Sequence, residues 1–134
     1  HLVGDILFCI GGIAIVLSAG GVERIYLYEI ELSNEICGVN YYNKDDKLTL
    51  EVPIKQLELQ LIDRSYKYTR FELVFIFPEI TLSINNDYGW KLEEIKKIYT
   101  TAKELQNEPF TLADQKKLNQ LDSIWREYDF SPTK

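Results

Sequence analysis

Apolar and polar residues alternate with a period of two from residue 23 to residue 84, and this pattern constrains the fold more than any other feature. Such alternation is typical of antiparallel strands that bury one face and leave the other in water. Short turn-forming segments, SNE, NKDDK and DRSYKY, separate the runs, while Pro53 and Pro78 mark strand ends. We therefore expect a meander of about six strands over residues 23–85. The expected apolar faces carry Tyr26, Tyr28, Ile30 and Leu32; Leu48, Leu50, Val52 and Ile54; Leu57, Leu59 and Leu61; Phe71, Leu73, Phe75 and Phe77; and Ile80, Leu82 and Ile84.

The period changes to that of a helix after the polar segment NNDYG. Apolar residues then recur every three or four positions, which predicts an amphipathic helix over residues 90–107. Asn86 or Asp87 can cap its start. Trp90 is expected to pack at the junction between strand and helix. The apolar stripe of this helix comprises Leu92, Ile95, Ile98, Ala102 and Leu105.

A second helix is expected over residues 111–128, with Thr111 as N-cap and Asp114 at the third position of a capping-box-like pair. Its apolar stripe comprises Leu112, Leu118, Leu121, Trp125 and Tyr128. The sequence has no internal repeat or low-complexity linker, so residues 1–134 are expected to form a single domain. The predicted fold class is α+β: an antiparallel bent sheet or partial barrel of six to eight strands, closed by one or two C-terminal helices.

The segment ILFCIGGIAIVL, residues 6–17, is apolar throughout and admits three interpretations. A membrane-spanning helix needs about 17–25 apolar residues, and the uncharged stretch, residues 6–22, is at the lower limit. A signal-peptide core requires a positive flank, whereas Asp5 precedes this segment. The third interpretation, which we favour, is an apolar hairpin over residues 5–18 that turns at the GG dipeptide. A membrane-anchor remnant stays open as the alternative.

The charge of the chain limits the partners that it can bind. The net charge is −6, and residues 1–90 carry 13 acidic and seven basic residues. Because phosphate contacts need a basic surface, we expect no nucleic-acid partner. A protein partner is expected, and a membrane can be involved only through residues 6–17.

The two cysteines, Cys9 and Cys37, lie outside any C-x-x-C pattern and have no histidine nearby, so we expect no metal site. We interpret both as free thiols; a disulfide between them is the alternative in an exported chain. A cytoplasmic or membrane-associated location is favoured over secretion. Because residue 1 is histidine and not methionine, we expect either that the chain is cut from a longer one or that His1 is left over from a tag, and the native N-terminus stays open.

Catalytic patterns are missing from the sequence. His1 is the only histidine, and no nucleophile elbow, P-loop or dinucleotide fingerprint occurs. Asp45 and Asp46 are interpreted as a solvated hairpin tip, and Glu29 and Glu31 as ordinary surface residues. We therefore assign no catalytic residue and no cofactor, and do not expect an enzyme.

Aromatic and basic residues gather around two predicted turns and form the only candidate site. The segment DRSYKYTR combines tyrosines with the one basic cluster of the acidic half. Such a combination is typical of a partner-binding surface. The alternative is that the tyrosines cover a sheet edge while lysine and arginine keep the loop soluble. The candidate partner-binding residues are Tyr41, Tyr42, Arg64, Tyr66, Lys67, Tyr68 and Arg70.

Two segments, LEVPIKQLELQLID and FELVFIFPEITLSINNDYGWKLEEIKKIYTTAKEL, resemble the end of small bacterial pleckstrin-homology-like domains. In those domains, a strand followed by proline leads to a final strand, a polar turn and a closing helix. The resemblance covers about residues 23–106. Some bacterial members carry membrane segments ahead of the domain, which would suit an anchor at residues 6–17. The resemblance implies a protein-binding scaffold and does not imply lipid recognition.

The function expected from the sequence is that of a non-enzymatic protein-binding module, membrane-associated if residues 6–17 are an anchor. One alternative is a carrier of a small apolar ligand or lipid, whose cavity Phe71, Phe75 and Phe77 would line. Another is an immunity or inhibitor protein, for which a small acidic domain is suitable.

Overall fold

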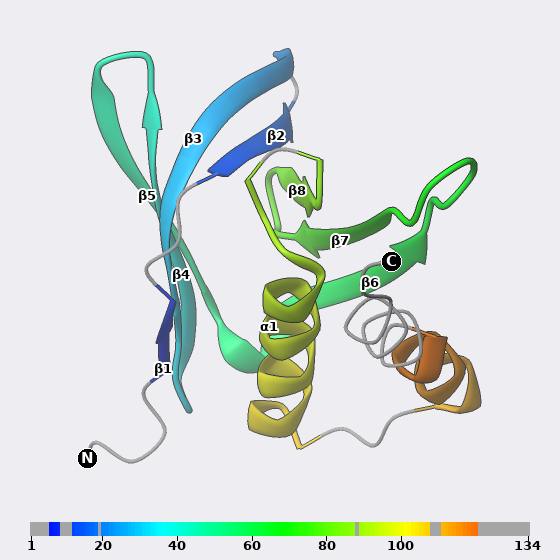
Figure 1. Cartoon of the computed structure of the whole chain (residues 1–134). Coiled ribbons are helices and arrows are strands. Elements are labelled where there is room, and N and C mark those ends of the chain that lie inside the picture. Colours follow the sequence, from blue (N-terminus) through cyan, green and yellow to red (C-terminus); the bar gives the residue numbers. More distant parts are fainter. Residues whose placement is uncertain (1–5, 9–11, 19, 88, 108–110, 121–134) are drawn as a thin grey trace.

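The computed structural model describes residues 6–8, 12–18, 20–87, 89–107 and 111–120 (Figure 1). These residues form one antiparallel sheet of eight strands, a short 3-10 helix and two helical segments, which confirms the predicted α+β partial barrel. The elements are β1 (Ile6–Phe8), β2 (Gly12–Ser18), β3 (Gly21–Leu32), β4 (Ile36–Asn43), β5 (Asp46–Pro53), η1 (Ile54–Gln56), β6 (Glu58–Asp63), β7 (Phe71–Ile76), β8 (Thr81–Asn85), α1 (Leu92–Leu105) and a helix at 112–120.

The strand order is β5-β4-β3-β2-β8-β7-β6, with β1 paired to β3. The strands therefore form two meanders, β3 to β5 and β6 to β8, and not the single meander that the sequence predicted. Strand β2 joins the two meanders, because it pairs with both β3 and β8. Consequently β5 and β6, which follow each other in the chain, lie at opposite edges of the sheet. The sheet bends around α1, which packs against β3, β7 and β8 inside the concavity (Figure 1).

The apolar opening segment forms strands, as favoured, but the predicted hairpin is wrong. Both β1 and β2 run antiparallel to β3, along successive parts of it: Ile6 pairs with Leu32, and Gly12 pairs with Leu27. The two strands thus point in the same direction, whereas hairpin arms must point in opposite directions. The hairpin turn lies after β2, where Ser18 pairs with Gly21. No helix of the described residues is long and apolar enough to cross a membrane.

Gly12 is a packing position and not the turn residue that its GG context suggested. A Cβ atom placed on Gly12 would lie 2.5 Å from Nε1 of Trp90 and within 2.9 Å of two further indole atoms. Trp90 is buried. The indole thus lies directly on the Gly12 backbone, which ties the start of β2 to the segment that precedes α1 and agrees with the junction expected for Trp90.

The alternation of buried and outward residues along β3 shifts at a β-bulge. Leu27 pairs with Tyr41 but Glu29 pairs with Asn40, so Tyr28 is the extra residue. A bulge shifts the alternation by one position. The predicted common face of Tyr26, Tyr28, Ile30 and Leu32 is therefore wrong. The buried residues of β3 are Ile25 and Leu27 before the bulge and Ile30 and Leu32 after it.

The apolar faces of the other meander are confirmed. Alternate residues of β6, β7 and β8 are buried in the core, where α1 packs against β7 and β8. Burying each large apolar side chain contributes about 1.5–3 kcal/mol. The buried residues that β6, β7, β8 and α1 contribute to this core include Leu59, Leu61, Phe71, Leu73, Phe75, Leu82, Ile84, Ile95, Ile98 and Ala102.

Cys37 is a free, buried thiol on β4, and burial raises its pKa to about 12. The free-thiol interpretation is thus confirmed for Cys37, while Cys9 lies outside the described residues. A buried free thiol of this kind behaves as a small apolar residue in packing.

The side-chain amide of Gln106, at the end of α1, forms hydrogen bonds with the segment that connects the two edge strands, β5 and β6. Its Nε2 donates hydrogen bonds to the carbonyl oxygens of Ile54 at 2.9 Å and Leu57 at 2.6 Å. Nζ of Lys55 donates in return to the Gln106 carbonyl oxygen at 3.0 Å. These contacts fix η1 against the C-terminal end of α1.

The second helix begins as expected. The Asp114 N–H donates to Oγ1 of Thr111, and the Thr111 N–H donates to the Asp114 carboxylate, both at 3.1 Å. The Tyr99 hydroxyl of α1 donates to Asp114 at 2.5 Å, which docks the second helix on α1. Burial and the hydrogen bond to Asp114 raise the pKa of Tyr99. The predicted residues 121–128 of this helix lie outside the described part of the chain.

Candidate functional site

The structure places the seven candidate residues at two separate sites. Arg64, Tyr66, Lys67, Tyr68 and Arg70 all lie on the loop of residues 64–70 between β6 and β7, whereas Tyr41 and Tyr42 lie on β4. Three strands, β3, β2 and β8, separate β4 from β7 in the sheet. The seven residues therefore do not form one surface.

Tyr41 does not belong to a contact surface. It is 8% exposed and packs in the core, so its selection as a partner-binding residue is wrong. Burial, with a smaller contribution from Glu23, raises its pKa. Tyr42 points to the other face of the sheet and is half-buried there, with its ring 4.8 Å from that of Tyr28.

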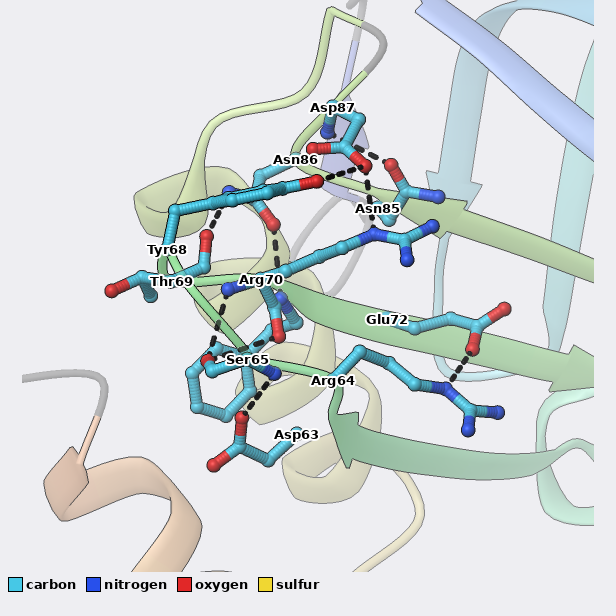
Figure 2. Close-up of polar contacts among 11 residues, drawn as sticks. Asp63, Arg64, Ser65, Tyr68, Thr69, Arg70, Glu72, Asn85, Asn86 and Asp87 are labelled. Carbon is cyan, nitrogen blue, oxygen red and sulfur yellow. Dashed lines mark hydrogen bonds and ion pairs between the residues drawn. The ribbon is translucent and has the colours of Figure 1, made fainter.

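The 64–70 loop is closed at its base by a set of short hydrogen bonds (Figure 2). The Arg64 N–H donates to the carbonyl oxygen of Arg70 at 2.8 Å. Oγ of Ser65 accepts the Arg70 N–H at 3.0 Å, and the Ser65 N–H donates to the Asp63 carboxylate at 2.9 Å. Satisfied backbone groups of this kind hold a loop in one conformation.

Asn86, which follows β8, holds the loop from the side. Its Nδ2 donates to the carbonyl oxygen of Thr69 at 3.0 Å, and its Oδ1 accepts the Phe71 N–H at 2.9 Å (Figure 2). One amide side chain thus satisfies two backbone groups of a neighbouring segment. Its role is to join the 64–70 loop to the end of β8.

Both arginines of the loop form ion pairs. Nε of Arg64 lies 2.9 Å from the Glu72 carboxylate, and Nε of Arg70 lies 2.7 Å from that of Asp87 (Figure 2). The Tyr68 hydroxyl donates to the same Asp87 carboxylate at 3.4 Å. Because the two guanidinium groups are engaged within the protein, they act as part of the frame of the loop.

The residues that the frame presents are Tyr66, Lys67 and Tyr68, which we call the tyrosine tip. Tyr66 is 88% exposed, Tyr68 is 58% exposed and Lys67 is exposed. The Tyr66 N–H donates to the Tyr68 carbonyl oxygen at 3.2 Å, so the tip itself is a tight turn. Two aromatic rings and one ammonium group therefore project from a fixed backbone.

The sequence did not indicate Asn86 and Asp87 as part of this site, because either was expected to cap the following helix. That expectation is wrong: α1 begins at Leu92, and the Lys91 N–H is capped by the Glu94 carboxylate at 2.9 Å. Asn86 and Asp87 lie in a turn that precedes α1, and their side chains contact the 64–70 loop instead of the helix. No local sequence signal distinguishes the two roles.

The described residues also bear on two other kinds of site, a metal centre and an apolar ligand cavity. The described residues contain no group of three or more His, Cys, Asp or Glu side chains that could hold a metal ion. The three phenylalanines expected to line a carrier cavity, Phe71, Phe75 and Phe77, are buried in the core. A groove of about 550 Å³ lies beside β6 instead, and its lining is polar, with Lys55, Lys103 and Gln106 among its residues.

Comparison of the chain with protein family models, curated proteins and solved structures finds no match in any of the three. The function is therefore inferred from the surface chemistry of this chain. Among the residues that the structure describes, Tyr66 of the tyrosine tip has the highest exposed fraction of any aromatic ring, and hydrogen bonds hold the backbone of its loop.

Proposed function

We propose that this chain is a non-enzymatic protein-binding module that contacts its partner through the tyrosine tip. The observation that carries the proposal is the 88% exposure of Tyr66 on a loop whose backbone is fixed at both ends. Tyrosine is enriched among the residues that dominate binding energy, because it offers a large contact area with few rotatable bonds. A partner would cover this ring.

The fixed frame supports the proposal on energetic grounds. Ordering a flexible loop on binding costs about 0.5–1.5 kcal/mol for each immobilised side chain. Here Asn86 and the pairs of Arg64 with Glu72 and Arg70 with Asp87 order the loop before any partner arrives. Binding energy from the tip is then available for affinity.

The alternative that the tyrosines cover a sheet edge is not favoured for Tyr66. A ring that covers an edge loses most of its exposed area, and Tyr66 retains nearly all of it. Tyr68 is intermediate, because its hydroxyl contacts Asp87. The bent sheet closed by α1 agrees with the protein-binding scaffold that the pleckstrin-homology-like resemblance implies.

The test uses a photo-crosslinking phenylalanine analogue at position 66 in cells that express the native protein. A matched control carries the analogue at position 112, where the natural leucine is 89% exposed on the second helix. We expect a discrete crosslinked protein from position 66 that position 112 does not give. This protein is then purified and titrated against wild-type chain and Tyr66→Ala.

Loss of the Tyr66 ring should weaken binding by at least about 30-fold, which corresponds to about 2 kcal/mol at an interface centre. The melting temperature should stay within 1–2 °C, roughly the change seen for neutral surface substitutions. Equal binding by Tyr66→Ala, or identical crosslinked species from both positions, would show that the tip is not the contact surface.

A further inference from the structure

β2 is apolar on both of its faces although α1 covers only one face of the sheet. Gly12, Ala14 and Val16 point inward and are buried. Ile13, Ile15 and Leu17 point outward, away from α1. A strand with one solvated face normally alternates, and a continuous apolar run is typical of strands that are covered on both sides. The sequence of β2 therefore indicates a second covering layer.

Neighbouring strands extend the outward residues of β2 into a contiguous surface. Cross-strand pairs join Leu17 to Val22, Ile15 to Arg24 and Ile13 to Tyr26, and Tyr26 pairs with Tyr42 of β4. Leu17, Val22 and Tyr26 are 47%, 65% and 46% exposed. We call this surface the outer stripe; its apolar and aromatic residues are Ile13, Ile15, Leu17, Val22, Tyr26, Tyr28 and Tyr42. The exposed Arg24, which pairs with Ile15, lies on the same face between Val22 and Tyr26.

The dimensions of the outer stripe fit one helix. From Val22 to Tyr28 the chain makes six steps of about 3.3 Å, so the stripe is about 20 Å long. This length matches about 13 residues of α-helix. The stripe is bordered on one side by the hydroxyl residues Thr81 and Ser83. On the other side lies Lys47, whose Nζ is 5.9 Å from the ring centroid of Tyr28 and 5.8 Å from that of Tyr42. A width of two to three strands, about 10–14 Å, suits a helix better than a second sheet.

Carboxylates lie at both ends of the outer stripe, and more of them lie beyond Tyr28. Beyond Tyr28 the outward residues include two carboxylates, Glu31 of β3 and Glu51 of β5, which both pair with Gly38 and have no side chain between them. Thr49 of β5, which pairs with Asn40, lies on the same face. Glu29 lies on the same face. At the opposite end, a groove of about 360 Å³ lies beside Leu17 and the turn between β7 and β8, with Phe77, Pro78, Glu79 and Ile80 in its lining.

We propose that the outer stripe docks an amphipathic helix of another protein. The apolar face of that helix lies on β2 and β3, and its Lys or Arg residues lie at the end that meets Glu31 and Glu51. Carboxylates at that end attract a basic segment and repel anionic lipid. This surface is separate from the tyrosine tip, so the inference does not depend on the proposed function.

The probe is a synthetic 14-residue helix with leucine repeating every three and four positions and lysine on the polar face and at one end. A matched peptide carries glutamate in place of lysine. Each is titrated into the isotope-labelled chain and followed by amide chemical shifts. We expect saturable binding of the lysine peptide, shifts confined to β2, β3 and β4, and at least tenfold weaker binding of the glutamate peptide.

Two variants assign the contact. Leu17→Ser combined with Val22→Ser changes only exposed side chains and should weaken binding at least tenfold. Glu31→Gln combined with Glu51→Gln should reduce both the affinity and its salt dependence. Leu112→Ser serves as a control, because it removes an apolar residue that is even more exposed, at 89%, on the second helix, and it should bind as wild type.

Five results would overturn the inference. The first is no binding of the lysine peptide at millimolar concentration, and the second is equal binding of both peptides. The third is a wild-type dimer in sedimentation that Leu17→Ser converts to monomer, since the stripe would then join two copies. The fourth is Leu17-dependent co-sedimentation with phosphatidylglycerol vesicles, since a membrane would then be the covering layer. Shifts at the tyrosine tip alone would equally refute docking on β2.

Discussion

Gly12→Ala tests whether this glycine is a packing position. The added methyl carbon would lie 2.5 Å from Nε1 of Trp90, and the nearby indole atoms belong to a rigid, buried ring. Because the ring cannot move aside without disturbing the start of α1, we expect a cost of about 1–3 kcal/mol, as for other overpacked sites. For a domain of this size the melting temperature should fall by about 3–10 °C.

The assay is urea unfolding followed by tryptophan fluorescence in a Trp125→Phe background, so that Trp90 is the one tryptophan of the chain. Gly20→Ala is the matched control, because its added Cβ meets only Oγ of Ser18, at 3.8 Å. This variant should be near neutral. The native-state emission of Trp90 should change in Gly12→Ala and not in Gly20→Ala.

A double-mutant cycle makes the reasoning refutable. Trp90→Phe provides a smaller ring, so Gly12→Ala should cost less in that background than in the wild type, with a coupling of at least about 0.5 kcal/mol. Equal costs in both backgrounds, or wild-type stability of Gly12→Ala, would show that the indole does not lie on Gly12.

Three further predictions concern the frame and the core. Asn86→Ala removes two hydrogen bonds to the tip loop and should destabilise the chain by about 1–3 kcal/mol, with faster amide exchange over residues 64–70 by mass spectrometry. Tyr99→Phe removes the hydrogen bond to Asp114 and should cost about 1–2 kcal/mol in urea unfolding at pH 7. Burial by itself would raise the pKa of Asp114, but hydrogen bonds from Tyr99 and Thr111 lower it overall. The ionised Asp114 therefore stabilises the folded chain above pH about 4, and this stabilisation is lost as the pH falls through the lowered pKa. The difference in stability between Tyr99→Phe and wild type should shrink over that range. Cys37 should resist iodoacetamide at pH 8 in the native state and react in urea, because burial raises its pKa to about 12.

The sequence pattern predicted the strand faces wherever alternation is unbroken, as in β6, β7 and β8. It failed at Tyr28, because a bulge adds one residue without any change in composition. It also failed to place β5 and β6 at opposite edges, since alternation shows which face of a strand is buried and not which strand lies beside it. The GG dipeptide is typical of a turn, and the sequence therefore predicted one at Gly12. The reason for glycine at this position is contact with the indole of Trp90, which is far away in the sequence.

For the candidate site, composition indicated the exposed tyrosines and both arginines of the loop, and it missed the residues outside the loop that hold it. Tyr66 and Tyr68 were found because aromatic residues in a basic turn are conspicuous. Asn86 and Asp87 were missed because their partners lie on another hairpin, and short polar residues before a helix are equally suited to capping it. Tyr41 was selected in error because alternation in β4 places it inward, next to an outward Tyr42.

The joining of two meanders through β2 and β8 has a consequence for how the chain folds. Within each meander, pairing strands are neighbours in sequence and can close by short turns. Pairing of Ile15 with Ser83 and Leu17 with Thr81 requires closure of a loop that contains most of the sheet. Loop closure on that scale slows folding. We expect the two meanders to form early and independently, with β2 and β8 pairing at the rate-limiting step, so that substitutions at this pairing slow folding more than equally destabilising substitutions at the hairpin tips.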